Sequence, residues 1–119
     1  GADALVVSNH GGRQLDGAES SIRALPKIAD AVGSDIEVLF DGGIRTGADI
    51  MRALALGARS CMIGRAYAWG LGAGGKPGVA KAIDILKKEL DSTMALCGVN
   101  RTSDSGPQVL VGHEGKNAR

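Results

Sequence analysis

Aromatic side chains are scarce in this chain of 119 residues, which contains one Trp, one Tyr and one Phe. So few rings offer no platform on which nucleic-acid bases could stack. An excess of one charge is lacking as well, because acidic and basic residues leave a formal net charge of only +1. Neither nucleic acid nor an anionic membrane is therefore predicted as an electrostatic partner. What remains is the ordinary composition of a soluble globular domain.

Cysteine and histidine are equally sparse, with two of each. Cys61 and Cys97 lie far apart in apolar surroundings, which predicts buried free thiols in a reducing compartment rather than a disulfide. His10 and His113 show no metal-ligand spacing, so no metal site is predicted. No apolar run approaches the roughly 18 residues of a membrane span, and no signal peptide is visible. A cytoplasmic location is expected.

Glycine, by contrast, is abundant, with 19 residues, well above the usual share of about 7 %. Many of these glycines follow short apolar runs, so they indicate turns and places where the backbone approaches another group closely. Three such runs predict strands at residues 4–8, 37–40 and 60–64. Because the runs are continuously apolar, the strands are expected to be buried on both faces, as in parallel sheets.

A helical pattern follows each predicted strand. Pro26 is expected to open the first helix and Gly33 to end it. Thr46 is expected to cap the second helix, which stops at Gly57. Pro77 begins the third and longest helix, whose apolar side chains recur at steps of three and four residues. These side chains are Val79, Ile83, Leu86, Leu90, Met94 and Cys97.

Strand, loop and helix repeated three times predict an α/β fold with a parallel sheet. Three such units cannot close a barrel, which requires about eight strands. The chain is therefore either a small open sheet or the C-terminal portion, about strands 6–8 with their helices, of a (β/α)8 TIM barrel. Since it begins directly before a strand-like run, an N-terminal part is expected to be missing. Residues 1–100 form the βα units in this interpretation, and residues 101–119, which lose all periodicity, form an irregular C-terminal tail.

Glycines and arginines follow the second and third predicted strands. Gly42, Gly43 and Arg45 come after the second, and Gly64 and Arg65 come at the end of the third. A phosphate needs free backbone N–H groups, the unobstructed approach that glycine allows, and positive charge. Each motif alone equally suits an ordinary βα turn with a solvated arginine. At consecutive strand ends, where phosphate sites of TIM barrels lie, the two motifs together predict an anion cradle.

The loop after the first predicted strand, SNHGGRQLD at residues 8–16, contains His10 and Arg13. Imidazole titrates near neutral pH and suits the abstraction of a proton from carbon or from a hydroxyl. Arginine grips a carboxylate through two parallel hydrogen bonds. By spacing alone, a histidine in a loop is more often structural than functional, and Asp16 is expected to act locally, by pairing with Arg13 or capping the next segment. The loop is thus a candidate for a base and a carboxylate clamp.

Three stretches together resemble the FMN-dependent α-hydroxy acid dehydrogenase/oxidase family, and within it the bacterial L-lactate dehydrogenases most closely. They read VVSNHGGRQLDG, LFDGGIRTGADIMRALALGA and MIGRAYAWGLGAGG, and the likeness covers residues 1–99. The first stretch is highly specific to the family, whereas the second is shared more loosely with other FMN- and phosphate-binding barrels. The resemblance implies FMN as the cofactor and a (β/α)8 barrel whose strands six to eight are present here.

The resemblance also implies roles for single residues. His10 is similar to the family's catalytic base, which lies against the substrate, and Arg13 is similar to the arginine that binds the substrate carboxylate. Ser8 resembles the serine near the flavin ring. The residues that the resemblance places at the ribityl chain and phosphate of FMN are Asp41, Gly42, Gly43, Arg45, Gly64 and Arg65.

The implied reaction is oxidation of an L-2-hydroxy acid, with L-lactate as the expected substrate, to the 2-keto acid. Two electrons pass to FMN, and His10 takes a proton either from Cα or from the hydroxyl. The family's flavin-ring lysine, its substrate tyrosines and the aspartate that partners the histidine lie earlier than the region matched here. The missing N-terminal part of the barrel is therefore an expected partner, and the isolated fragment is expected to be inactive.

The resemblance implies two further properties and leaves two alternatives open. Family members are commonly tetramers or octamers, so a homo-oligomer is expected, and association with the periphery of the inner membrane is a second expectation for location. One alternative is another FMN-binding barrel, such as the type 2 isopentenyl diphosphate isomerase, whose family carries GGIR-like and ALALGA-like sequence. The other is a barrel fragment without catalytic function.

Overall fold

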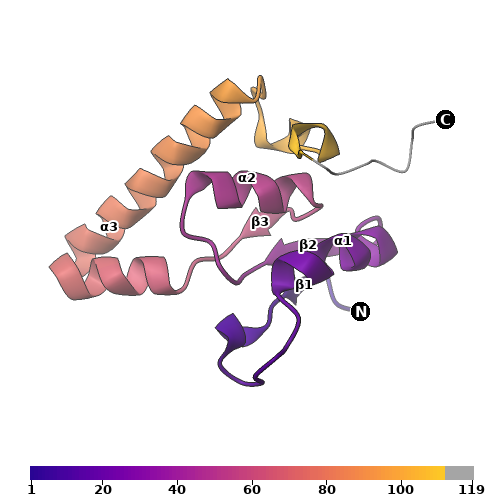
Figure 1. The fold of residues 1–119 in the computed structure, drawn as a ribbon, viewed down its shortest axis with the longest axis horizontal. Helices are drawn as coiled ribbons and strands as arrows, with labels where there is room; N and C mark the ends of the chain where they lie inside the picture. The colour runs from indigo at the N-terminus through magenta and orange to yellow at the C-terminus, as the bar shows by residue number, and fades with distance from the viewer. Residues whose placement is uncertain (112–119) are drawn as a thin grey trace.

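The computed structural model describes residues 1–111 and contains one parallel sheet. The strands lie side by side in the order β1 (Ala4–Val7), β2 (Glu37–Phe40) and β3 (Ser60–Cys61). A helix follows each strand, as Figure 1 shows. These helices are α1 (Ser21–Val32), α2 (Gly47–Ala55) and α3 (Arg65–Leu96). The predicted α/β class with a parallel sheet is confirmed.

The register of the sheet brings the carboxyl ends of the three strands to one edge. Val7 of β1 is paired with Phe40 of β2, and Phe40 is paired with Cys61 of β3. β3 is shorter than the predicted strand at 60–64, although the backbone N–H of Met62 still donates to the carbonyl of Phe40 at 2.8 Å. The three loops that carry the candidate residues therefore leave the sheet at neighbouring points.

Helices cover only one face of this sheet within residues 1–111. Val7, Val38 and Phe40 are almost fully buried in a core with side chains of α1 and α2. Burying an apolar side chain of this size contributes about 1.5–3 kcal/mol to stability. Because side chains alternate between the two faces of a strand, Val6 and Met62 point away from that core and are 44 % and 43 % exposed. The expectation that the strands are buried on both faces is therefore wrong for the described chain.

α1 begins five residues earlier than predicted, so Pro26 lies inside the helix and does not open it. Ser20 is the N-cap, and the helix ends before Gly33 as expected. A proline at this position removes one backbone hydrogen bond near the helix start. Leu25, which has no exposed surface, and half-buried Ile22 anchor the early turn in the core. Packing thus overrides the local signal of the proline.

The N-terminus of α2 carries the predicted cap at Thr46. The Thr46 hydroxyl accepts the N–H of Asp49 at 3.2 Å, and the Asp49 carboxylate accepts the N–H of Thr46 at 3.0 Å, which forms a reciprocal capping box. Burial alone would raise the pKa of Asp49, but hydrogen bonds from Thr46 and Arg45 and the charge of Arg52 lower this pKa below its usual value. The carboxylate therefore stays ionised at the helix start, where its charge is favourable.

α3 starts at Arg65, twelve residues before the predicted start at Pro77. Its backbone leaves the helical conformation at Gly74 and Gly75, so a first helical stretch precedes the periodic one that the sequence predicts. The first stretch escaped prediction because it is rich in glycine, which has a low helix propensity. α2 and α3 pack side by side. Within residues 1–111, no helix combines the length and apolar character needed to cross a membrane.

The described part of the predicted C-terminal tail lies against α2 rather than extending freely (Figure 1). It forms two short 3-10 turns, Thr102–Asp104 and Pro107–Val109. The Ser105 hydroxyl lies 3.2 Å from the sulfur of Met51, a residue of α2 that is only 2 % exposed. His113, expected in this tail, lies outside the described residues.

The two cysteines are free, as predicted, but only one of them is sheltered. Burial raises the pKa of the Cys61 thiol to about 11, so this group stays protonated at neutral pH. Cys97 is exposed at the C-terminal end of α3. The expectation of burial is wrong for Cys97 because the residue lies just past the last turn of its helix.

Candidate functional site

One cleft at the carboxyl edge of the sheet brings together most of the candidate residues. It has a volume of about 590 Å³ and is lined by the loops that follow all three strands. The predicted site residues along it are His10, Arg13, Asp41, Gly42, Gly43, Arg45, Gly64 and Arg65. Ser8 is the one predicted residue that does not line this cleft. Residues that are far apart in sequence are therefore neighbours in space.

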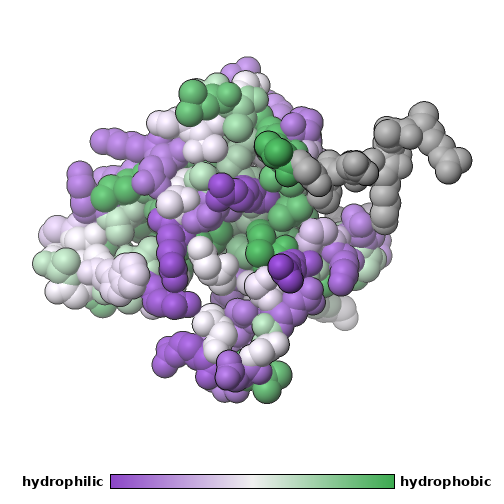
Figure 2. Space-filling model, viewed as in Figure 1, coloured by the Kyte–Doolittle hydropathy of each residue, from purple (hydrophilic) through white to green (hydrophobic). Residues whose placement is uncertain are grey.

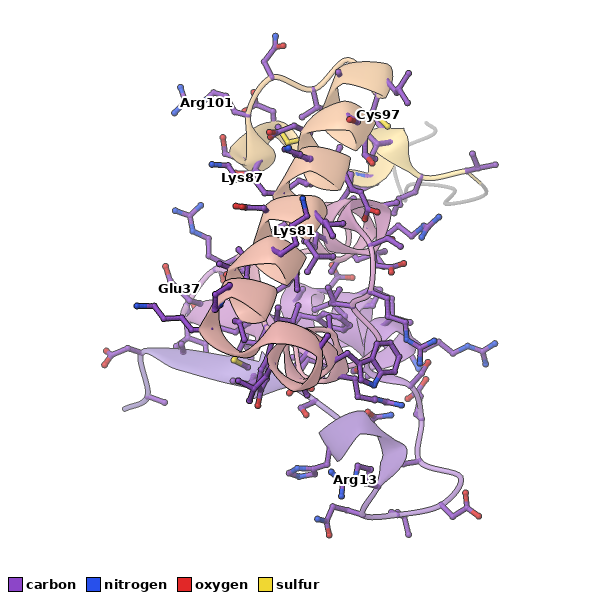
Figure 3. The ribbon with its side chains drawn as sticks, turned by 90° about the vertical axis from the view of Figure 1, so that its left-hand side faces the viewer. Arg13, Glu37, Lys81, Lys87, Cys97 and Arg101 are labelled. Carbon is purple, nitrogen blue, oxygen red and sulfur yellow. The ribbon has the colours of Figure 1, made fainter. Side chains whose placement is uncertain are left out.

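The histidine lies on a tight left-handed turn, His10–Gly12, that follows β1. His10 has φ of 55°, and Gly11 and Gly12 have φ of 67° and 73°. Glycine adopts this conformation without strain, and histidine is one of the few other residues enriched there. The loop projects from the body of the molecule (Figure 1). Figure 3 shows Arg13 on this projection, at the end of the molecule opposite Cys97.

Ser8 stabilises the His10–Gly12 turn through its side chain. Its hydroxyl accepts the backbone N–H of His10 at 3.1 Å. The neighbouring Asn9 donates from its side chain to the carbonyl of Glu19 at 3.4 Å, which joins the two ends of the loop. The surface of the projecting loop is mostly hydrophilic or neutral (Figure 2). Ser8 thus contributes to the geometry of His10 in this structure rather than to the wall of the cleft.

The two glycines after β2 have different roles. Gly42 has φ of 105°, and a Cβ at this position would overlap the Ser21 hydroxyl and lie 3.4 Å from the Asn9 amide oxygen. Gly42 therefore allows the loop to pack against α1. Gly43 has φ of 84° and would meet no atom within 4 Å. Its backbone faces open space in the cleft, where it leaves room for a ligand.

The backbone donors at the start of α2 are already occupied. The N–H groups of Arg45 and Thr46 donate to the Asp49 carboxylate at 3.2 Å and 3.0 Å. The N–H of Gly47 donates at 2.9 Å to the carboxylate of Glu89, which reaches across from α3. Two carboxylates at one helix start repel a further anion. This half of the predicted cradle therefore offers the Arg45 side chain and the Gly43 backbone, but not a helix N-terminus.

The start of α3 is open by comparison. Its N-cap is Gly64, so no side chain caps the first turn, and a Cβ on Gly64 would meet nothing within 4 Å. Uncapped N–H groups and the positive end of a helix dipole favour an anion. The Arg65 side chain lies over the cleft and donates from Nη2 to the carbonyl of Gly11 at 3.3 Å. The start of α3 is therefore the more favourable end of the cleft for an anion.

Asp41 has the one buried side-chain oxygen among the described residues that lacks a hydrogen-bond partner. Its Oδ1 atom is inaccessible to solvent, whereas the residue itself lines the cleft. A buried acceptor without a donor is unfavourable. The Asp41 carboxylate is therefore a candidate hydrogen-bond acceptor for a ligand in the cleft.

Sequence reasoning missed several residues of the cleft wall, and Tyr67 is the most prominent. Tyr67 is 44 % exposed and stands in the first turn of α3, two residues after Arg65. Tyr67 was not predicted as a site residue because residues 65–73 were not expected to be helical. The other unpredicted lining residues are Gly11, Gln14, Ile44, Met62, Ile63 and Ala68.

Comparison with known proteins agrees with the resemblance seen in the sequence. The sequence model of the FMN-dependent dehydrogenase family matches residues 1–112. The chain is 59 % identical over 111 residues to an L-lactate dehydrogenase of Actinobacillus pleuropneumoniae serotype 5b (strain L20), covering 93 % of this chain and 29 % of the relative. An L-lactate dehydrogenase of Caulobacter vibrioides (strain NA1000 / CB15N) is 56 % identical over the same length, with the same coverage. The chain thus spans about 29 % of the length of these relatives.

Solved structures agree with the sequence comparison. A mandelate oxidase variant that carries a monooxide FMN adduct matches with a TM-score of 0.81 and 48 % identity, over 83 % of this chain and 32 % of that one. A monotopic membrane protein, (S)-mandelate dehydrogenase, matches with a TM-score of 0.87 and 42 % identity, over 92 % of this chain and 29 % of that one.

Proposed function

Since the chain belongs to the FMN-dependent dehydrogenase family, we propose that it supplies the FMN cradle and the proton-abstracting histidine of an enzyme that oxidises an L-2-hydroxy acid, with L-lactate as the substrate. The observation that carries this proposal is the single cleft that His10 and Arg13 share with Arg45, Gly64 and Arg65. A base, a carboxylate clamp and an anion site lie along one wall. The isomerase alternative has no comparable support, because it gives the SNHGGRQLD loop no role.

The proposed fold is the C-terminal portion of a (β/α)8 barrel, with β1, β2 and β3 as its last three strands. The parallel order of the strands and the uncovered sheet face support this assignment. In a barrel that face is turned inward and filled by layers of side chains from other strands, which accounts for exposed Val6 and Met62. Residues 1–100 form the βα units in this proposal, and residues 101–119 form the tail beyond them.

The cleft fits FMN at both ends of its sugar-phosphate chain. The phosphate would bind at the open N-terminus of α3 with Arg65, Arg45 and the Gly43 backbone. A ribityl hydroxyl would donate to the carboxylate of Asp41, which lines the cleft. FMN, when bound, supplies a two-electron acceptor for the substrate. Gly42 keeps the loop that holds these groups packed against α1.

The substrate would bind beyond the flavin end of the cradle, at the projecting loop. Arg13 would pair with the substrate carboxylate, and a neutral His10 imidazole would accept one proton from the L-2-hydroxy acid. The hydroxy acid loses two electrons and two protons when it becomes the 2-keto acid. His10 would take one proton, and the two electrons with the second proton would pass to FMN. Both side chains are exposed in the cleft, which leaves them accessible to a small molecule.

A chimera tests this function directly. We would replace the matching 111 residues of the Actinobacillus relative with this chain, purify the protein and add L-lactate without oxygen. The expected result is a yellow flavoprotein whose flavin absorbance is bleached by L-lactate. The 119-residue chain alone serves as the comparison and is expected to bind FMN weakly and to show no bleaching. A chimera that binds flavin but is not reduced by L-lactate, beside an active parent, would contradict the proposal.

Replacing Asp41 with asparagine should weaken FMN binding by roughly tenfold or more, because a hydrogen bond to a charged acceptor is worth about 1.5–3 kcal/mol. The measurement is titration of the flavin-free chimera with FMN, followed by flavin fluorescence. Asp16→Asn is the matched control, since Asp16 is exposed and, within residues 1–111, its carboxylate accepts only the neighbouring N–H of Gly17 at 3.1 Å. Equal affinities for the two variants would remove Asp41 from the cradle.

Assembly and location follow from the family as further proposals. We expect the complete enzyme to form a homo-oligomer, a tetramer or octamer, and to be cytoplasmic with a peripheral association to the inner membrane. The structural relative (S)-mandelate dehydrogenase is described as a monotopic membrane protein, which supports the association. Sedimentation of the chimera, with and without membrane vesicles, measures both properties.

A further inference from the structure

The turn that carries His10 is held to the rest of the described chain by a single hydrogen bond, from Nη2 of Arg65 to the carbonyl of Gly11 at 3.3 Å. The other hydrogen bonds of the turn are local. Gly12 N–H donates to Asn9, Arg13 N–H donates to His10, and His10 N–H donates to Ser8. The turn has glycine at two of its three left-handed positions, and glycine adopts many backbone conformations where no contact restrains it. It therefore depends on a tertiary contact for its orientation.

Arg65 makes this contact from the far side of the site. It is the first residue of α3 and follows β3, whereas Gly11 belongs to the loop after β1. β2 lies between these two strands, so the arginine side chain reaches across the width of the sheet edge. No other element is joined by a hydrogen bond to the turn His10–Gly12 in residues 1–111.

The chemistry of the guanidinium group allows it to bind two partners together. Arginine has five N–H donors in a planar fork and remains charged at all relevant pH values. One donor reaches Gly11, and the others are free to bind an anion at the open start of α3. Lysine, by contrast, is a compact point charge with a different reach, so it cannot reproduce both contacts.

We propose that Arg65 is a positioning residue, which sets the orientation of the His10 turn through the Gly11 carbonyl and links this orientation to the anion bound at the start of α3. An anion that orders the arginine side chain also orders the turn. By reciprocity, the ordered turn favours the anion. The inference extends the proposed function, in which this turn carries the base and the carboxylate clamp.

Hydrogen exchange in the flavin-free chimera tests the link, with inorganic phosphate as the probe. In the unsubstituted protein, phosphate should slow amide exchange in residues 9–13. In Arg65→Lys, exchange there should be about three- to tenfold faster, as expected for loss of one hydrogen bond, and phosphate should no longer slow it. Arg45→Lys is the matched control, because Arg45 lines the same cleft without a hydrogen bond to the turn. Its exchange in the absence of phosphate should equal that of the unsubstituted protein.

The α2 peptide serves as an internal standard of folding in the same experiment. Unchanged turn exchange in Arg65→Lys would overturn the proposal. Faster exchange in α2 as well as in the turn would overturn it too, because Arg65 would then be a general folding contact. If amide exchange in the turn were faster by the same factor in Arg45→Lys, the cause would be the replacement of an arginine in the cleft and not the loss of the Gly11 contact. This result would also overturn the proposal.

Steady-state kinetics at saturating FMN provides a second readout, which a simple phosphate ligand would not change. Arg65→Lys should lower kcat by roughly ten- to 100-fold even when FMN is saturating, because a displaced base loses the reacting geometry. Full recovery of kcat in Arg65→Lys at saturating FMN would reduce the residue to a phosphate ligand. Absence of L-lactate oxidation in the unsubstituted chimera would refute the proposed function, while the exchange result would still decide the role of Arg65.

Discussion

The variant His10→Ala in the chimera is expected to bind FMN normally but to be reduced by L-lactate about 10²–10⁴-fold more slowly, the range for loss of a general base. Among the described residues of the cleft, His10 has the only imidazole side chain, the group used most often for general-base catalysis. Removing the imidazole leaves the substrate proton without an acceptor, while the phosphate cradle on the other two loops is unchanged. Anaerobic stopped-flow absorbance of the flavin measures the rate, and FMN titration measures binding.

The backbone of His10 requires a second variant as control. With φ of 55° at this position, alanine is disfavoured, so His10→Ala could also disturb the turn. Asparagine tolerates the left-handed conformation well but cannot act as a base. His10→Asn is therefore expected to show the same loss of rate with normal exchange protection of the turn. Normal flavin reduction in His10→Asn would remove the histidine from the proton-transfer role.

The second large effect is a loss of stability, which is expected when Gly47, the first residue of α2, is replaced. A Cβ at this position would overlap the backbone of Leu90 and Glu89 and lie 2.7 Å from the Cβ of Glu89. The Gly47 N–H also donates to the Glu89 carboxylate at 2.9 Å, so the two helices touch where the chain has no side chain. Gly47→Ala is expected to destabilise the protein by about 3 kcal/mol, because α3 must move off α2.

Gly72→Ala is the matched control for this substitution. Gly72 lies within α3, and a Cβ there would meet nothing within 4 Å. Alanine at this position should stabilise the helix by about 0.5–1 kcal/mol. The thermal unfolding midpoint of each chimera measures the difference. A midpoint for Gly47→Ala that equals that of Gly72→Ala would show that the helices do not approach as closely as the structure has them.

Two acidic residues lie beside the proposed phosphate cradle. Asp49 and Glu89 occupy the backbone donors at the start of α2, which strengthens the helix but denies this end to phosphate. The uncapped start of α3 and the two arginines then remain as the favourable place for negative charge. Because carboxylates cap the start of α2 and no side chain caps the start of α3, an anion in the cleft would be favoured at the α3 end.

Local patterns in the sequence determined the elements whose causes are themselves local. The capping box between Thr46 and Asp49 spans four residues, and its residue types predict the helix start correctly. The apolar period of the later part of α3 and the three strand-loop-helix units are likewise readable, because burial of one face imposes their spacing. The residues of the SNHGGRQLD loop likewise predict the family, which the comparison with known proteins confirms.

Tertiary structure decided the features that depend on contacts between distant segments. Pro26 lies inside α1 because Leu25 and Ile22 pack in a core that other strands build. The glycine-rich residues 65–73 are helical against their intrinsic propensity. Most of all, the Arg65–Gly11 hydrogen bond, the Glu89–Gly47 hydrogen bond and the buried Asp41 oxygen arise from partners that lie far apart in the chain or from enclosure by the fold. No local sequence pattern encodes these contacts, because their partners come together only once the sheet has brought the loops to one edge.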